Sequence, residues 1–283
     1  METGVRDIVV GRIDLKRWVQ EPRWLLAFSV AMVLCLLTYA INASISEINP
    51  GNSWGITYGT FASILMVGDV LYAVRRRMLK YDLGNSKTWV QFHVYGGTLF
   101  AVLVLMHSGF RWPVGLMNWV LWSLSLWVTL SGLFGVFLQR WIPTILSSGL
   151  SVEVVYERIP ELVDQVRICA EKVVEECTDT VKDFYKMNLA GALVAPQSKA
   201  IYFVDVTGGI RTMLRTFEYI RPLLTLEEKG KLERLEGMYK TKLELDAHFT
   251  IQRPLRWWLY THVPVSLMLV LLVALHLYVV SVY

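Results

Sequence analysis

The sequence predicts an all-α fold, an integral membrane helical bundle with five transmembrane helices and a mostly helical cytoplasmic insert between spans four and five. Hydrophobic residues make up 54% of the 283 positions and charged residues 18%, which is more apolar than a soluble chain of this size. Five apolar runs are each near or above the roughly 20 residues that cross a bilayer core. Tryptophan lies at or near the start of every run, as interfacial anchoring favours.

The runs divide the chain into four parts. Residues 1–23 form an amphipathic N-terminal segment, 24–138 hold spans one to four, 139–256 are the insert, and 257–283 hold span five. The spans are expected at residues 24–41, 54–74, 89–110, 117–138 and 257–282. Asp69 is the one acidic residue inside them. We expect it to pair with an arginine of the 75–77 cluster, or else to carry protons for redox chemistry.

The orientation of the bundle follows from lysine and arginine. Five precede the first span and five lie in 75–88, whereas 43–53 has none and 111–116 has only Arg111. The positive-inside rule therefore predicts a cytoplasmic N-terminus and an outside C-terminus, as in a bacterial inner membrane. A signal peptide in place of span one is the alternative, but the segment before it is long and contains acids.

The insert has the character of a solvated, water-facing domain. It contains 17 basic and 17 acidic residues, a balance that excludes a nucleic-acid-binding patch. Helical spacing of apolar residues predicts one helix over 160–186. A Thr225 and Glu228 capping box predicts another from Thr225 to about His248. Residues 201–209 are expected to be a strand or an extended loop, so the insert should be a two-helix hairpin that serves as a docking surface.

Cysteine and glycine motifs exclude several kinds of site. The chain has three cysteines and no C-x-x-C-H, which excludes covalent c-type haem and a four-thiolate iron–sulfur cluster. It also has no G-x-G-x-x-G and no P-loop, so a nucleotide-binding domain is not expected.

Four of the five histidines share one spacing. His93 and His107 are 14 residues apart in span three, and so are His262 and His276 in span five. At about 100° per residue the two side chains of each pair lie about 40° apart around the helix and about 21 Å apart along it. Because spans three and five run in the same direction, His93 should face His262 (the inner pair) and His107 should face His276 (the outer pair).

Two facing imidazoles at each of two levels favour two non-covalent haem b groups, each with both axial positions filled. A buried hydrogen-bonded histidine or a proton relay is the alternative for any single histidine. Zinc would need its ligands at one level. Gly96 and Gly97 would let a flat ring approach the backbone, and Arg111, Arg253 and Arg256 would bridge haem propionates or simply reach the membrane surface. Ser131, Gly132 and Gly135 form a small face for close helix packing.

The two H-x13-H pairs resemble those of the di-haem b-type membrane cytochromes. This group includes the quinone-oxidising cytochrome b subunits, the cytochrome b561 class and the ferric reductase and NADPH oxidase membrane domain. The resemblance covers residues 54–138 and 257–283 and implies that His93, His107, His262 and His276 are axial iron ligands. It does not cover the insert, and the flavin and nicotinamide domains of ferric reductases have no counterpart in these 283 residues.

Three functions are therefore expected in order of preference. The first is a subunit of a respiratory or photosynthetic redox complex that exchanges electrons between the quinone pool and a partner cytochrome, iron–sulfur protein or flavoprotein. A quinone is then a further ligand, with Tyr58, Tyr95 and Tyr260 as candidates that could equally pack against haem. The second is a transmembrane reductase that passes cytoplasmic electrons from a separate flavoprotein to an outside acceptor. The third is a haem-free membrane anchor. An electron-transfer subunit of a quinone-linked oxidoreductase is favoured over a stand-alone enzyme.

Overall fold

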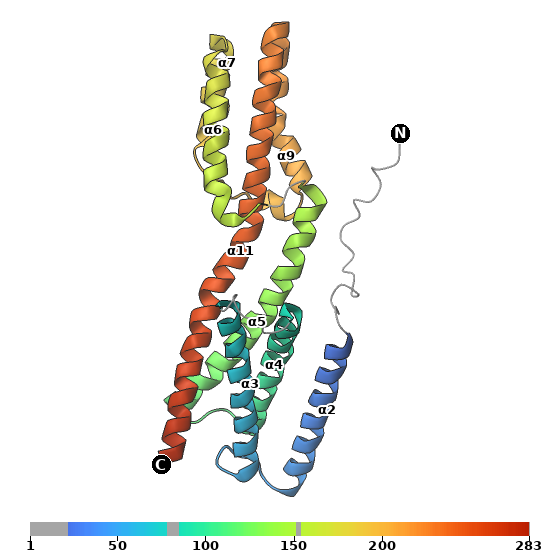
Figure 1. Cartoon of the computed structure of the whole chain (residues 1–283), viewed down its shortest axis with the longest axis vertical. Coiled ribbons are helices and arrows are strands. Elements are labelled where there is room, and N and C mark those ends of the chain that lie inside the picture. The colour runs from blue at the N-terminus through green and yellow to red at the C-terminus, as the bar shows by residue number, and fades with distance from the viewer. Residues whose placement is uncertain (1–21, 78–84, 151–153, 283) are drawn as a thin grey trace. The chain divides into compact units, whose positions relative to one another are not determined.

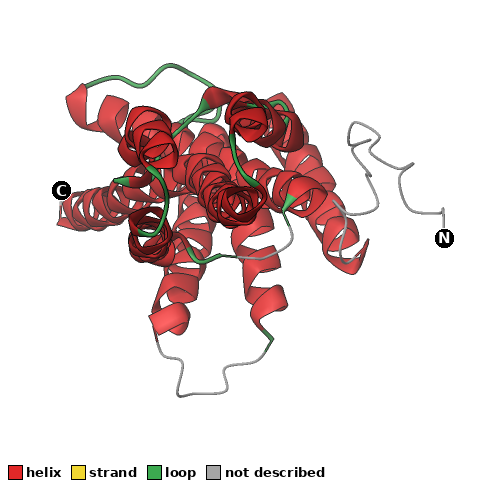
Figure 2. Cartoon of the chain, turned by 90° about the horizontal axis from the view of Figure 1, so that it is seen from above, coloured by secondary structure: helices red, strands yellow, loops and turns green. Residues whose placement is uncertain are grey.

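The computed structural model describes residues 22–77, 85–150 and 154–282. Every regular element in these residues is an α-helix or a 3-10 helix, joined by short loops (Figure 2). Five of the helices are long and apolar enough to cross a membrane. The all-α class and the integral membrane character are thus confirmed, while most of the N-terminal segment 1–23 lies outside the described residues.

The five long helices follow the predicted spans in order. They are α2 (Pro22–Ile45), α3 (Ser53–Arg77), α4 (Ser86–His107), α5 (Leu116–Gly149) and α11 (Leu226–Val282). The last two extend well beyond a single span, over 34 and 57 residues. Their additional turns continue into the insert.

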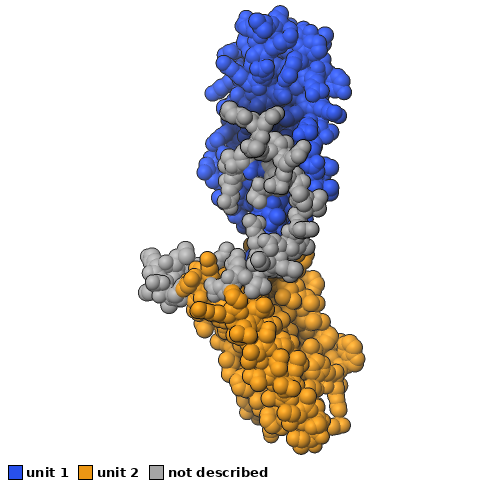
Figure 3. Space-filling view, turned by 90° about the vertical axis from the view of Figure 1, so that its right-hand side faces the viewer, with its two compact units in different colours: residues 1–11, 138–257 blue, residues 12–137, 258–283 orange. Residues whose placement is uncertain are grey.

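The chain divides into two compact units (Figure 3). The insert unit comprises Leu138–Trp257, and the membrane unit comprises the described parts of Arg12–Phe137 and Trp258–Tyr283. All four histidines of the two predicted pairs belong to the membrane unit. That the insert and the N-terminal segment are cytoplasmic stays a prediction.

In the membrane unit, α3 and α4 pack side by side (Figure 1). The core they share with α11 is apolar, and burying such side chains favours their association. A buried hydrogen bond from Asn42 Nδ2 to the Tyr58 hydroxyl, 2.8 Å long, joins α2 to α3. The buried core residues are Ile48, Tyr58, Ala62, Met66, Phe100, Leu103, Met106 and Leu269.

The ends of α4 are fixed by local chemistry. The Asn85 side chain accepts a hydrogen bond from the backbone N–H of Lys87 at 3.0 Å, which caps the first turn. After His107 the chain turns through Gly109, whose φ of 63° suits a residue without Cβ. The Phe110 N–H then bonds to the Leu105 carbonyl at 2.9 Å. Helix α4 therefore stops directly after its second histidine.

The helix predicted over 160–186 is wrong in its continuity. It consists of α6 (Ile159–Glu175) and α7 (Asp179–Asn188). Thr178 has an extended backbone and stands at the N-cap of α7, with its hydroxyl bonded to Glu228. The apolar spacing runs across this break because residues of both helices, such as Val163, Val174 and Val181, are buried in the unit.

The strand or extended loop expected at 201–209 is also wrong. The segment forms the 3-10 helix η2 (Ala200–Phe203) and the start of α9 (Val206–Leu214). Asp205 caps α9, because its carboxylate accepts the Gly208 N–H at 2.8 Å. Asp205 is a good N-cap residue and so indicated the start of a helix. The β-branched residues around it, which favour strands, led to the wrong prediction.

The insert is not a two-helix hairpin, since it adds α8 (Ala190–Leu193), α10 (Thr216–Ile220), and the 3-10 helices η1 (Tyr156–Arg158) and η3 (Arg221–Leu223). The capping box is confirmed, with Thr225 N bonded to Glu228 Oε2 at 3.0 Å. The helix it starts does not end near His248 but continues through Pro254 to Val282. Buried residues hold it on both sides of the proline, including Ile251 in one unit and Leu269 in the other.

A buried ion pair within α11 holds a carboxylate that binds another segment of the insert. Lys242 Nζ lies 2.6 Å from Asp246 Oδ2, and both side chains are inaccessible to solvent. Asp246 Oδ1 accepts the Gln197 N–H at 2.8 Å. Burial lowers the pKa of Lys242 and raises that of Asp246, while their mutual hydrogen bond opposes both shifts. Loss of either partner would leave a buried charge. The Asp246 hydrogen bond to Gln197 ties the loop before η2 to the helix.

Candidate functional site

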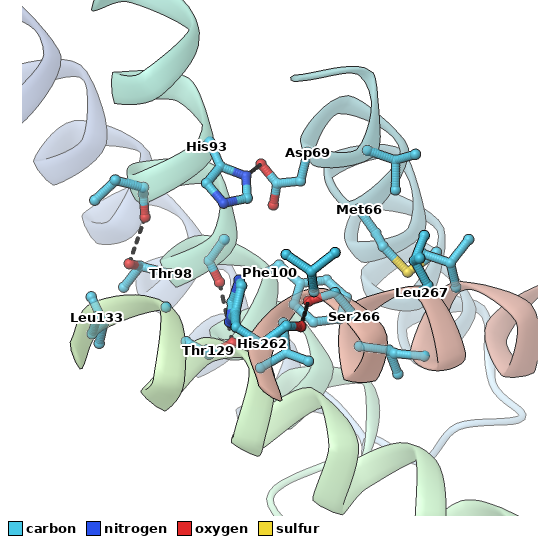
Figure 4. Close-up of a pocket in the computed structure, with 18 of the residues that line it drawn as sticks. Met66, Asp69, His93, Thr98, Phe100, Thr129, Leu133, His262, Ser266 and Leu267 are labelled. Atoms are coloured by element: carbon cyan, nitrogen blue, oxygen red, sulfur yellow. Dashed lines mark hydrogen bonds and ion pairs between the residues drawn. The ribbon is translucent and has the colours of Figure 1, made fainter. Parts of the chain in front are cut away.

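The inner histidines line one cavity of the membrane unit. His93 of α4 and His262 of α11 both border a cavity of about 170 Å³, shown in Figure 4. Its walls come from α3, α4, α5 and α11 and are mostly apolar, with Met66, Phe100 and Leu133 among them. Two imidazoles from different helices therefore open onto the same apolar space.

The outer histidines lie directly beside each other. The ring centroids of His107 and His276 are 6.4 Å apart, and the ring planes are inclined by 81°. Helices α4 and α11 thus bring His107 beside His276, and both His93 and His262 to one cavity. That arrangement requires the two helices to run parallel with their histidines level.

Hydrogen bonds at Nδ1 orient two of these rings. His107 Nδ1 lies 2.8 Å from the Gly55 carbonyl oxygen, which can only accept, so Nδ1 carries the hydrogen. His107 therefore keeps the lone pair on Nε2, the state in which a neutral imidazole binds a metal. His262 Nδ1 lies 2.8 Å from Ser131 Oγ, and it has the same tautomer when the Ser131 hydroxyl donates to the Val128 carbonyl, 3.1 Å away.

The inner ring of α4 has a different neighbour. Asp69 Oδ1 of α3 lies 3.5 Å from His93 Nδ1, and the two side chains face each other in Figure 4. Among the described side chains Asp69 therefore pairs with His93, while the expected pairing with an arginine of the 75–77 cluster stays a prediction, because the side chains of Arg76 and Arg77 lie outside the described residues. Arg75 instead donates to Ser86 Oγ at 3.0 Å and lies over the Trp89 ring.

Gly96 and Gly97 lie beside this carboxylate. A Cβ atom at either position would lie 3.4 Å from an Asp69 oxygen, at van der Waals contact. Gly97 also borders the cavity of the inner pair. The sequence did not predict that these glycines lie against Asp69, and their approach by a flat ring stays a prediction.

The small-residue face of α5 packs as predicted. A Cβ at Gly135 would lie 2.0 Å from the Trp258 ring, and one at Gly132 would lie 3.4 Å from His262. Trp258 Nε1 donates to the Ser131 carbonyl at 2.6 Å, and its ring stacks on His262 at 5.2 Å. Ser131, Gly132 and Gly135 together hold Trp258 and His262 against α5.

Sequence reasoning missed a second small-residue face, on α3. A Cβ at Gly59 would lie 2.8 Å from His107 Nδ1, and the Gly55 carbonyl is the acceptor for that same nitrogen. The two glycines form a G-x-x-x-G pattern, which signals close helix packing in membranes. That pattern could have placed α3 against the outer histidine.

Two of the three predicted arginines, Arg111 and Arg256, have protein partners in the described structure. Arg111 lies 3.3 Å from Glu47, with both side chains mostly exposed. Within the insert unit, Arg256 pairs with Glu157 and lies over the Tyr156 ring, and Arg253 is exposed. Their predicted contacts to haem propionates stay predictions. The fifth histidine, His248, is buried in the insert unit and bonds to Gln252.

Comparison with known proteins found no relative of this chain. The chain matches no protein-family model, no curated protein and no solved structure. The site must therefore be interpreted from its own geometry.

The glycine contacts lead to a stability prediction. Alanine at Gly59 or Gly135 should lower the free energy of unfolding by about 1–3 kcal/mol, because the new methyl group overlaps the His107 or Trp258 ring. Gly237→Ala is the matched control, since nothing lies within 4 Å of a Cβ there. It should stabilise the helix by roughly 0.5–1 kcal/mol. Thermal unfolding of the full chain in detergent measures all three, and equal melting temperatures would contradict the packing described.

Proposed function

We propose that the chain carries electrons across a membrane through two non-covalent haem b groups. His93 and His262 would hold the inner haem, and His107 and His276 the outer one. The observation that carries the proposal is the hydrogen bond from His107 Nδ1 to the Gly55 carbonyl, which leaves Nε2 free as a ligand, together with the Ser131 hydroxyl as the Nδ1 partner of His262. Metal-bound histidines have this type of Nδ1 partner almost without exception.

The spacing of the outer rings fits a shared metal. Two imidazoles that bind one metal through bonds of about 2.0–2.1 Å place their ring centroids about 6 Å apart. The observed separation is 6.4 Å. An edge-to-face aromatic contact has a similar distance, so the spacing supports the proposal without deciding it.

The chemistry of the inner cavity suits a porphyrin, although the cavity is small for one. Its apolar walls suit the faces of a porphyrin, and His93 and His262 are its nitrogen donors. At about 170 Å³ it is smaller than the roughly 300–1,000 Å³ of pockets for organic ligands. A porphyrin would enter only with displacement of lining side chains such as Met66 and Leu267.

The bound groups would supply one-electron redox chemistry with no open coordination position. The protein's part is to hold and orient the four imidazoles. The Gly55 carbonyl and the Ser131 hydroxyl fix the rotation of two rings, and His107 of the half-buried outer pair follows the buried core residue Met106 in α4. The roughly 21 Å rise between the two levels makes a route across most of a bilayer core.

The quinone pool is the proposed mobile partner on the outer side. A second cavity of about 340 Å³, lined mostly by apolar side chains such as Trp54, Phe61 and Leu99, also includes Tyr58. The Tyr58 oxygen accepts the Asn42 hydrogen bond, which leaves its proton for a quinone carbonyl. Its neighbour in sequence, Gly59, touches His107. Adjacent residues of α3 therefore contact the two sites: Tyr58 lines this cavity, and Gly59 lies against His107 of the outer pair.

The other partners and the location belong to the same proposal. A cytochrome, an iron–sulfur protein or a flavoprotein would exchange electrons with the inner haem, in a respiratory or photosynthetic complex of a bacterial inner membrane. The lysine and arginine distribution supports a cytoplasmic N-terminus and an outside C-terminus. A reductase fed by a separate flavoprotein would use the same haem route, and a haem-free anchor would not use it at all.

Histidine variants test the ligand pairs. His107→Ala and His276→Ala should each remove the same haem, about half of the total, because a porphyrin with one axial ligand is held much more weakly. His93→Ala and His262→Ala should each remove the other haem. Haem content and the reduced-minus-oxidised spectrum of the purified variants measure this.

His248→Ala is the control, because His248 is a buried histidine that lies in the insert unit. It should retain both haems. If His107→Ala and His262→Ala depleted the same spectral component, the proposed pairs would be wrong.

The quinone cavity makes a separate prediction. Leu99→Trp should fill the cavity and slow the oxidation of reduced haem by a short-chain quinone at least tenfold, while Tyr58→Phe should slow it about 2- to 10-fold by the loss of one hydrogen bond. Tyr278→Phe, an exposed tyrosine of α11, is the control and should leave the rate unchanged. Stopped-flow absorbance measures the rate, and a normal rate in Leu99→Trp would exclude the cavity as the quinone site.

A further inference from the structure

The histidine pairs differ in the group that faces Nδ1. His107 and His262 face neutral acceptors, a backbone carbonyl and a hydroxyl. His93 faces the carboxylate of Asp69. A carboxylate is the only one of these three acceptors that carries a charge, so the inner and outer levels are electrostatically unequal.

Asp69 is built into the bundle rather than placed at its surface. Its side chain is 15% exposed, and its two oxygens lie beside Gly96 and Gly97 of α4. The Tyr72 ring lies 5.2 Å from the His93 ring on the same side. Helices α3 and α4 therefore both hold the carboxylate against His93.

Two buried atoms at this contact lack a hydrogen bond in the described structure. They are Asp69 Oδ1 and His93 Nδ1, the same two atoms that face each other at 3.5 Å. Buried polar atoms without a partner are costly and rarely occur without a function. A small rotation of either side chain would convert the contact into a full hydrogen bond, with Nδ1 donating to the carboxylate and Nε2 left as the ligand.

We propose that Asp69 makes the His93–His262 centre the lower-potential one of the two. This rests on the proposed function, because it requires a haem at each pair. A carboxylate bonded to Nδ1 makes a ligating imidazole a stronger electron donor, and its charge stabilises the oxidised iron more than the reduced iron. The outer pair, with the Gly55 carbonyl as acceptor, lacks this effect. Electron transfer from the inner level to the outer level is then favourable.

The consequence is a direction for the route. Electrons from a partner at the inner level would move toward the His107–His276 level and reach the cavity that contains Tyr58. The chain would then serve as a quinone-reducing subunit more readily than as a quinol-oxidising one. Asp69 is a positioning residue in this scheme, because it acts through His93 and touches no substrate.

The test is a redox titration of the full-length protein followed by visible absorbance. Asp69→Asn keeps an acceptor of the same size but removes the charge. It should raise the midpoint potential of the lower component, leave the higher one in place and narrow the gap between them. Asp69→Glu keeps the charge and should leave the lower component below the higher one. Glu47→Gln, which removes an exposed carboxylate beside Arg111, should change neither component.

Single-haem variants identify the components and decide the matter even if Asp69→Asn fails to hold its inner haem. His276→Ala should retain the inner haem and His262→Ala the outer one, and the inner haem should have the lower potential. An inner potential equal to or above the outer one would overturn the inference, as would an Asp69→Asn protein in which neither component or both components shift equally. Wild-type protein without haem would instead refute the proposed function.

Discussion

The equal spacing of two histidines on two parallel helices is the constraint around which the membrane unit is organised. It requires α4 and α11 to keep the same register, so that His107 meets His276 while His93 and His262 share one cavity. The neighbouring helices are shaped to allow this. Gly59 of α3 gives His107 its space, and Gly132 and Gly135 of α5 give space to His262 and Trp258. Small residues serve here to bring side chains, rather than helix backbones alone, into contact.

The inner and outer histidine pairs are oriented in the same way but differ in the charge beside them. At each level a ring of α4 or α11 is oriented through Nδ1 by a neighbouring helix, by Gly55 on α3 or by Ser131 on α5. Of the three rings with a described Nδ1 partner, His93 alone has an acid in that position. In an apolar medium one charge has a large effect on nearby redox equilibria, because little solvent screens it. A single aspartate is thus enough to distinguish two otherwise similar sites.

The sequence was sufficient for the spans and the histidine pairs, because hydropathy and a 14-residue interval are local properties. It was insufficient for Asp69, whose partner lies on the next helix, 24 positions away, and was chosen by packing. The sequence also did not predict the break between α6 and α7. The apolar periodicity continues across Thr178, although the helix is interrupted there. The helix expected to end near His248 continues through Pro254, and buried residues lie on both sides of the proline in α11. Capping residues such as Asp205 and Thr225 were the better signals.

The central claim is that each histidine pair holds a low-spin haem. The most direct measurement is the electron paramagnetic resonance spectrum of the purified oxidised protein, together with its haem content per chain. Two haems per chain, both low-spin and both unreactive toward carbon monoxide when reduced, are the predicted result, because two imidazoles fill the axial positions. A protein purified from cells that supply haem, yet containing none, or one with high-spin iron that binds carbon monoxide, would contradict it.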